Sequence, residues 1–321
     1  MGQGRDDLIV KVRFLLHDKA GDNTLALLEL IDQIQRFGIA YHFKEEIGSL
    51  LSKLFESYPN LTLGRCSDDD LYMVSLLFRL LRQQGHRASS DVFDVFKDPA
   101  TGKFRESLAG NVLGVLGLFE AGHMLVPGDD ILEEALAFTS THLESVKEER
   151  EAPFIAKLVK QALKQPLRQG YPRVEAWHYI HIYQDDASCN ETVLALAKSD
   201  FNYLQKLHHK EASDVVRWWK ERDFVGHMPF MRDRIVECYL WILSVYFEPE
   251  FSFARVFLAK IVAMTSLMDD MFDAYGTLEE QELFTEALER HVAEFHEGAL
   301  LYHNYFTYAE FIQLSPFPGG T

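Results

Sequence analysis

Three aspartates in the C-terminal third of the chain have the residue type and spacing of a metal site. Asp269, Asp270 and Asp273 directly follow the apolar run Phe251–Met268, which predicts one buried helix. Asp269 and Asp273 would share one face of that helix, with Asp270 beside them. They lie at its C-terminal end, where the helix dipole disfavours negative charge, so local helix stability does not explain them. Binding of Mg²⁺ would explain their position, because this ion takes one or two carboxylates together with substrate phosphates.

Other acidic runs have a structural explanation. The runs 68–70 and 129–130 stand at predicted helix starts, where the dipole favours acids. Asp185 and Asp186 follow a predicted helix but lack a third acid at a suitable spacing. A solvated acidic helix end is also the alternative for residues 269–273, but there metal binding is the favoured interpretation.

Arg232 and Arg234 precede a nearly all-apolar helix and stand at alternate positions in a connection. Two guanidinium groups placed in this way can point into one space, and arginine binds phosphate through a permanent charge and a bidentate geometry. Ordinary salt bridges to Asp233 and Glu237 are the alternative. The residues alone do not decide between the two.

Aromatic side chains follow on the same predicted helix, among them Trp241. An aromatic lining stabilises a cation by about 0.5–2 kcal/mol for each well-placed ring. Core packing is the alternative, and for most of these rings it is the favoured interpretation.

Helical periodicity dominates the rest of the chain and predicts an all-α fold. Apolar stripes run along 25–34 and 43–55. Further helices are predicted at 68–84, 108–124, 131–145, 152–164, 173–183, 191–221, 232–247, 250–275 and 278–296. Gly276 is expected to end the helix that carries the aspartates, and Thr277 with Glu280 matches a capping box for the next helix.

Composition excludes several classes of function. The net charge of −17, from 32 basic and 49 acidic residues, argues against nucleic acid as a partner. Three widely spaced cysteines predict neither a disulfide framework nor a zinc site. The start of the chain has no apolar signal core, and Glu237 and Lys260 interrupt the longest apolar runs. We therefore expect no membrane span and a cytoplasmic protein.

Several blocks together resemble a plant class I terpene synthase of the sesquiterpene type. They are RDRIVECY at 232–239, Trp241, FEP at 247–249, DDMFDAYGT at 269–277, FKD at 96–98, GKF at 102–104, ESL at 106–108, AK at 197–198, DFN at 200–202 and RWWK at 217–220. The resemblance runs from about residue 8 to about residue 290. A DDxxD motif alone would not separate this family from prenyl-chain-elongating synthases, but the two-part layout and the Arg-Asp-Arg block do.

The resemblance implies a division of the chain. Residues 1–188 would form an N-terminal α-barrel domain, and residues 189–290 the first part of an isoprenoid-synthase helical bundle. Residues 291–321 would be a divergent tail. The DxDD motif of protonation-initiated cyclases is absent, so the N-terminal domain is expected to be catalytically silent.

The resemblance also assigns roles to the candidate charged residues. Asp269, Asp270 and Asp273 would bind Mg²⁺, with Mn²⁺ as a possible substitute, and through it hold a prenyl diphosphate. Arg232 and Arg234 would bind the diphosphate as it leaves.

The hydrocarbon part of the substrate has an implied partner as well. Trp241 would line the pocket in which the allylic cation cyclises. The lack of a transit peptide favours a cytosolic sesquiterpene synthase that uses farnesyl diphosphate. We also expect a monomer.

One departure from the family pattern is large. Class I synthases carry a second metal motif, Asn/Asp-Asp-x-x-Ser/Thr-x-x-x-Glu, on a later helix. Nothing after Asp273 matches it, and Asn304 is followed by Tyr305 instead of an acid. We therefore expect a chain that is truncated in its C-terminal domain and inactive alone. The alternative is a non-catalytic helical protein, or pseudogene product, derived from a terpene synthase. A third hypothesis, an intact chain-elongating enzyme, is rejected because the second acidic motif is missing.

Overall fold

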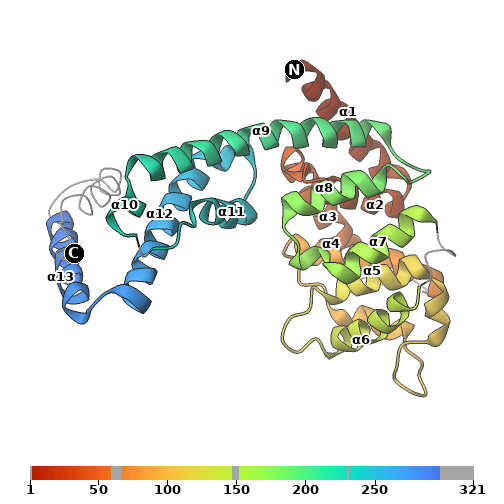
Figure 1. Ribbon diagram of the computed structural model, residues 1–321. Helices are drawn as coiled ribbons and strands as arrows, with labels where there is room; N and C mark the ends of the chain where they lie inside the picture. The colour runs from red at the N-terminus through yellow and green to blue at the C-terminus, as the bar shows by residue number, and fades with distance from the viewer. Residues whose placement is uncertain (1, 59–66, 147–151, 230, 297–321) are drawn as a thin grey trace. The chain divides into compact units, whose positions relative to one another are not determined.

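A computed structural model of the chain describes residues 2–58, 67–146, 152–229 and 231–296. Regular structure in these ranges is helical, and no strand forms within them (Figure 1). An isolated bridge joins Lys97 and Phe104 in a connection. The all-α prediction is confirmed. Most of the predicted tail, from residue 297 onward, lies outside the described residues.

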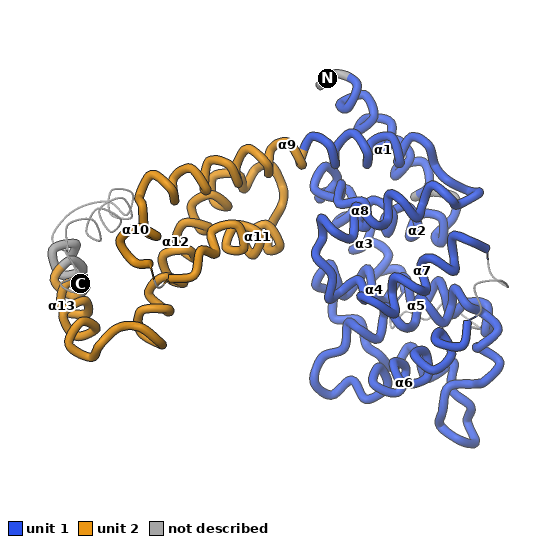
Figure 2. Tube along the Cα trace, in the orientation of Figure 1, with its two compact units in different colours: residues 1–203 blue, residues 204–321 orange. Residues whose placement is uncertain are grey.

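The chain divides into two compact units, residues 1–203 and residues 204–321 (Figure 2). The division falls within one helix, α9 (Glu191–Glu221), whose bounds match the predicted helix. The predicted domain boundary after residue 188 lies in the turn before α9. That the N-terminal family domain ends at residue 188 stays a prediction.

Unit 1 is built from helices that pack around one continuous apolar core. Its helices are α1 (Gly2–Asp22), α2 (Thr24–Arg36), α3 (Lys44–Ser57), α4 (Leu71–Gln83), α5 (Val112–Gly122), α6 (Asp130–Glu144), α7 (Pro153–Lys164) and α8 (Pro172–Tyr183). Helix α5 packs between α4 and α6, and α2 packs on α4. Buried leucine, isoleucine and phenylalanine side chains on the inner faces of these helices form the core.

Local signals set the ends of these helices. The Asn23 side chain accepts a hydrogen bond of 3.1 Å from the Ala26 amide and so caps α2. Gly38 follows the end of α2 with a φ of +70°, a conformation that favours glycine. Ser67 and Asp70 form a reciprocal capping box ahead of α4. The helix start expected at residues 68–70 is confirmed.

Unit 2 contains the predicted metal and arginine residues. After α9 come α10 (Phe224–His227), α11 (Ile235–Val245), α12 (Ser252–Asp270), a π-helical turn (Met271–Tyr275) and α13 (Leu278–His296). Helices α11 and α12 lie side by side and contribute to a second apolar cluster (Figure 1). That cluster includes Trp219 of α9, Tyr239 of α11 and Leu267 of α12.

A fully buried ion pair joins three helices of unit 2. Arg255 of α12 has 0% exposure, and its Nε and Nη2 each donate to a carboxylate oxygen of Glu211 on α9, both at 2.8 Å. The Tyr239 hydroxyl of α11 donates to the same carboxylate at 2.7 Å. The Arg255 Nη1 also donates to the Glu248 carbonyl at 2.6 Å. Burial alone would raise the pKa of Glu211. The hydrogen bonds that Glu211 accepts from Arg255 and Tyr239 contribute to lowering this pKa instead, so the pair stays charged inside the core.

Replacing Arg255 with alanine should destabilise unit 2 by about 3–5 kcal/mol, because it leaves Glu211 buried without its partner. Urea unfolding followed by tryptophan fluorescence measures this. The matched control is Arg217→Ala, whose ion pair with Asp214 is exposed and should contribute less than about 1 kcal/mol. A loss for Arg255→Ala as small as that of the control would contradict the assignment.

We predicted that no helix would be long and apolar enough to span a membrane. By length and composition alone, one helical stretch among the described residues is. The helical stretch Pro249–Tyr275 has a window of mean hydropathy 1.5, of which 28% is buried. The charged residues Arg255 and Lys260 do not lower the mean hydropathy of this stretch enough to exclude it. The core helix of a soluble protein passes the same test, and α12 packs on α11 and holds the Arg255–Glu211 pair inside unit 2.

Candidate functional site

The arginine connection and the aspartate motif meet in unit 2. Arg232 lies just before α11, and Asp270 is the last residue of α12. The Arg232 backbone amide donates to Asp270 Oδ2 at 2.8 Å, and its Nε donates to Asp270 Oδ1 at 2.6 Å. Arg232 Nη2 also contacts this carboxylate and lies 3.9 Å from Asp269 Oδ2. Residues 38 positions apart therefore share one site.

Asp270 differs from the other two aspartates in its environment. It is 2% exposed, whereas the Asp269 side chain is 59% exposed and Asp273 is exposed. The hydrogen bond from Arg232 lowers the pKa of Asp270 and more than offsets the opposing effect of burial. Asp270 is therefore a carboxylate whose lone pairs are already engaged, while Asp269 and Asp273 face solvent.

The aspartate motif spans a change in helix type. Helix α12 ends at Asp270, and residues 271–275 form a π-helical turn. The predicted single α-helix through residue 275 is therefore wrong in its last turn. A π turn has wider hydrogen-bonded rings and is often found at functional sites. Within the described residues, no three His, Cys, Asp or Glu side chains are gathered closely enough to hold a metal ion.

Gly276 closes the π turn in a way that differs from the predicted cap. Its amide donates to the Met271 carbonyl at 2.7 Å, and its φ of −79° is not left-handed. A side chain here would place Cβ 2.7 Å from the same carbonyl oxygen. The Gln281 side-chain amide donates to the carbonyls of Phe272 and Gly276, at 3.0 and 3.1 Å. Glycine is therefore needed for close backbone approach, not for a positive φ.

The capping box predicted at the start of α13 is confirmed. The Thr277 amide donates to Glu280 Oε2 at 2.9 Å, and the Glu280 amide donates to Thr277 Oγ1 at 3.3 Å. This pair begins α13 directly after the π turn.

Replacing Gly276 with alanine should open the π turn, because the added methyl group meets backbone that has little room to shift. We expect a loss of about 1–3 kcal/mol and faster amide hydrogen exchange at residues 276–281. The control is Gly110→Ala, where nothing lies within 4 Å of the added carbon. Equal exchange rates at 276–281 in the two variants would rule out the steric requirement.

The other two predicted site residues, Arg234 and Trp241, form no hydrogen bond with Asp270 among the described residues. Arg234 precedes α11 and its Nε lies 3.6 Å from Glu237 Oε2, which is the salt-bridge alternative for this residue. Its charge contributes to lowering the pKa of Asp270 after the larger contribution of Arg232. Trp241 on α11 is 47% exposed. Its predicted role as a pocket lining stays a prediction.

Sequence reasoning missed three residues that hold the site together. Arg255 stands inside what reads as an apolar run, and its buried partner Glu211 lies 44 positions away. A lone arginine within an apolar helix is a signal of a buried ion pair. Gln281, which binds the π turn, had no comparable signal.

Replacing Arg232 with glutamine should lower the stability of unit 2 in a pH-dependent manner. Because the folded pKa of Asp270 is depressed, its contribution is present above the unfolded carboxyl pKa, near 4, and is lost as the pH falls through the folded value. The stability difference from wild type should therefore shrink between pH 5 and pH 2, roughly. Urea unfolding at several pH values measures it.

Arg234→Gln is the matched control, because its ion pair with Glu237 is more exposed and longer. Its stability difference should be smaller than that of Arg232→Gln and should change less with pH, because Arg234 makes the smaller contribution to the pKa of Asp270. A difference for Arg232→Gln that does not change with pH would show that its contact with Asp270 is not charge-dependent.

Comparison with known proteins gives the family. The N-terminal domain of terpene synthases matches residues 1–163, which is half of the chain, and the metal-binding domain of the terpene synthase family matches residues 220–300. The second match includes the arginine connection, the aspartate motif and the π turn. The chain belongs to the terpene synthase family, and the resemblance seen in its sequence is confirmed.

Named plant enzymes are similar over most of this chain. The (−)-germacrene D synthase of Vitis vinifera is 55% identical over 271 residues, which are 84% of this chain and 47% of that protein. The valencene synthase of Vitis vinifera is 48% identical over 89% of this chain and 50% of that protein. The (−)-alpha-pinene synthase of Fragaria vesca is 46% identical over the same shares. The chain spans about half the length of these relatives.

Solved structures agree in fold. Isoprene synthase from grey poplar leaves has a TM-score of 0.82 and 32% identity, over 97% of this chain and 58% of that one. A second structure of that enzyme, in complex with three Mg²⁺ ions and dimethylallyl-S-thiolodiphosphate, has a TM-score of 0.82 and 33% identity, over 96% of this chain and 59% of that one. The all-α terpene synthase fold of this chain therefore rests on sequence and structure together.

Proposed function

We propose that this chain carries the first half of a class I sesquiterpene synthase site, which ionises farnesyl diphosphate with the help of Mg²⁺. The observation that carries the proposal is the contact between Arg232 and the Asp269–Asp270 pair. A diphosphate needs both metal ligands and fixed positive charge in one place. This contact brings the two kinds of group together from segments far apart in the sequence.

The donor chemistry of the motif fits Mg²⁺. Carboxylate oxygens are its preferred protein ligands, and one or two of them suffice when phosphates supply the rest. Asp269 and Asp273 are exposed and could take this role, whereas Asp270 is bound to Arg232 and would have to leave it to act as a ligand. The bound ion would supply charge that neutralises the departing diphosphate, and Mn²⁺ has similar preferences. The Mg²⁺ complex of the poplar isoprene synthase supports the same assignment.

The chain's own residues would assist by position and charge. Asp270 holds Arg232 at the edge of the motif, so this guanidinium is oriented before any diphosphate arrives. Arg234 lies two residues along the same connection and adds a second positive charge. Trp241 on α11 would face the hydrocarbon part of the substrate. The germacrene D and valencene synthases among the relatives support farnesyl diphosphate as that substrate.

We also propose that these 321 residues bind metal and diphosphate without turning substrate over. The sequence after Asp273 carries no second acidic metal motif. Helix α11 and the stretch from α12 to α13 expose large apolar side chains, and water at such a surface would quench a carbocation. The exposed side chains there include Val236, Leu240, Val245, Phe253, Phe272 and Leu278.

Binding is tested by titrating the chain with inorganic pyrophosphate in the presence and absence of Mg²⁺, using calorimetry. We expect saturable, Mg²⁺-dependent binding that weakens at least about tenfold in Asp269→Ala and in Asp273→Ala. Asp69→Ala is the control, because it removes an exposed aspartate from an acidic run in unit 1. Incubation with farnesyl diphosphate and Mg²⁺, followed by gas chromatography, should show no volatile hydrocarbon.

Robust hydrocarbon formation would refute the inactivity. Pyrophosphate binding that is absent, or unchanged in both variants, would instead favour a non-catalytic helical protein. The engagement of Asp270 by Arg232 is the observation that speaks for that second candidate. The monomeric state and the cytosolic location stay predictions.

A further inference from the structure

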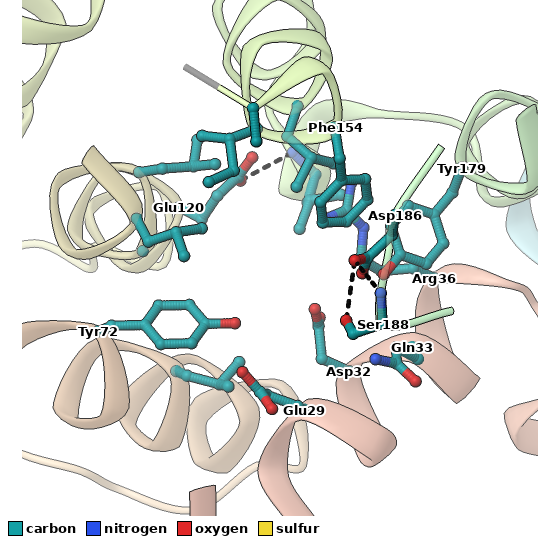
Figure 3. Close-up of a pocket in the computed structure, with 18 of the residues that line it drawn as sticks. Glu29, Asp32, Gln33, Arg36, Tyr72, Glu120, Phe154, Tyr179, Asp186 and Ser188 are labelled. Carbon is teal, nitrogen blue, oxygen red and sulfur yellow. Dashed lines mark hydrogen bonds between the residues drawn. The ribbon is translucent and has the colours of Figure 1, made fainter. Parts of the chain in front are cut away.

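Two pockets of unit 1 have opposite balances of charge. The first has a volume of about 380 Å³ and is lined by five carboxyl side chains and two arginines. Figure 3 shows Asp32, Glu120 and the Tyr72 hydroxyl around its polar centre. Its arginines, Arg36 and Arg79, each contact a carboxylate. The first pocket therefore has no uncompensated positive charge.

The second pocket has a volume of about 670 Å³ and an excess of basic side chains. Its lining comes from residues 82–90 at the end of α4 and beyond it, from residues 123–129 between α5 and α6, and from Arg168. Three arginines and two histidines line it, against one carboxylate, that of Asp129. The whole chain has the reverse balance, with 32 basic and 49 acidic residues.

The carboxylate of Asp129 is already compensated by a cation. Arg82 Nη2 donates to Asp129 Oδ1 at 3.1 Å, and Nη1 contacts Oδ2. The Ser90 hydroxyl and the Val126 amide donate to the same carboxylate at 2.8 and 2.9 Å. The hydrogen bond from Arg82 makes the largest contribution to lowering the pKa of Asp129 to about 2.

Arg82 also fixes the walls of the pocket. Its Nε and Nη2 donate to the Ala88 carbonyl at 3.0 and 2.9 Å, and its Nη1 donates to the Met124 carbonyl at 2.9 Å. One guanidinium group thus joins the connection that follows α4 to the connection that follows α5. The walls are in place before any ligand arrives, which reduces the entropic cost of binding.

The other two arginines of the lining are uncompensated. Arg87 lies in the connection after α4, and Arg168 lies in the short 3-10 helix Leu167–Gln169. Both residues are exposed, and neither forms an ion pair or a side-chain hydrogen bond within the part of the chain that the structure describes. Two positive charges are therefore available in one pocket.

The ends of the neighbouring helices do not require these two arginines. Cations often stand at helix C-termini because the last carbonyl groups there lack partners. Here the backbone amides that follow α4 and α5 donate to carbonyl groups at the ends of both helices, those of Leu80, Leu81, Arg82, Phe119, Ala121 and Gly122. Capping of the helices therefore does not explain Arg87 and Arg168.

Part of the lining is apolar. Met124, Leu125 and Val126 follow one another in it, and Leu125 is 39% and Val126 53% exposed. The volume of the pocket is within the range for small organic ligands, roughly 300–1,000 Å³. A matching ligand has a negatively charged group for the arginines and an apolar part for residues 124–126.

We propose that this pocket binds the phosphate monoester of a small organic molecule, with the phosphate group at Arg87 and Arg168 and the organic part on residues 124–126. A phosphate monoester carries close to two negative charges at neutral pH, which matches two guanidinium groups without ion-pair partners among the described residues. Arginine is suited to phosphate by its permanent charge and bidentate geometry. The site is independent of the metal chemistry proposed for unit 2.

Calorimetric titration of the full chain with phenyl phosphate, in metal-free buffer at physiological ionic strength, tests the proposal. We expect saturable binding of one molecule per chain. Benzenesulfonate, which has one negative charge, should bind about tenfold more weakly, inorganic phosphate at least about threefold more weakly, and phenol not measurably. Arg87→Gln and Arg168→Gln should each weaken the binding of phenyl phosphate by at least about tenfold, with circular dichroism as a check on folding.

Two control variants show whether phenyl phosphate binds in this pocket or elsewhere on the chain. Arg217→Gln removes an exposed arginine from unit 2 and should leave the affinity unchanged. Asp269→Ala should also leave it unchanged, so failure of the proposed metal site does not affect this test. Absence of saturable binding to wild type, or wild-type affinity in both pocket variants, would overturn the proposal. An equal loss in Arg217→Gln would overturn it as well, because the attraction would then be general.

Discussion

The buried pair of Arg255 and Glu211 is the constraint on which unit 2 depends. A guanidinium with no exposed surface is tolerated only while its carboxylate partner stays in place. Because the pair joins α12 to α9, and the Tyr239 hydroxyl joins α11 to the same carboxylate, three helices are held in one arrangement. The start of α11 carries the arginine connection and the end of α12 carries the aspartates. The ion pair therefore determines where both halves of the site meet, although it lies inside the core and takes no part in the site itself.

Much of the fold could be predicted because its signals are local. The bounds of α9 and α13 follow from apolar periodicity, and the capping boxes at Ser67 and Thr277 follow from side chains three residues apart. Helix α1, over residues 2–22, was not predicted. Its apolar residues follow no single stripe, so its position depends on packing against α2 and not on its own pattern.

The site was predictable in its membership but not in its geometry. The spacing of the aspartates and the Arg-Asp-Arg block indicated which residues belong together. The spacing could not show that Asp270 is turned inward to bind Arg232. The residue types are the same whether the two side chains are paired with each other or exposed to solvent. The π turn was equally hidden, since it depends on Gly276 approaching the Met271 carbonyl and on Gln281 reaching back from α13. These are tertiary contacts, and no local pattern encodes them.

The π turn has a consequence for how motifs of this kind are compared between proteins. In a regular α-helix, the fourth residue after Asp269 would return to nearly the same direction, offset by about 40°. The chain rotates less per residue in a π turn, whose hydrogen-bonded ring is wider. With the same sequence, Asp273 therefore points in a different direction than it would in a regular α-helix. Two chains with identical Asp-Asp-x-x-Asp text can therefore present different angular relations between their carboxylates. The residue that ends the turn, Gly276, belongs to the definition of the motif as much as its acids do.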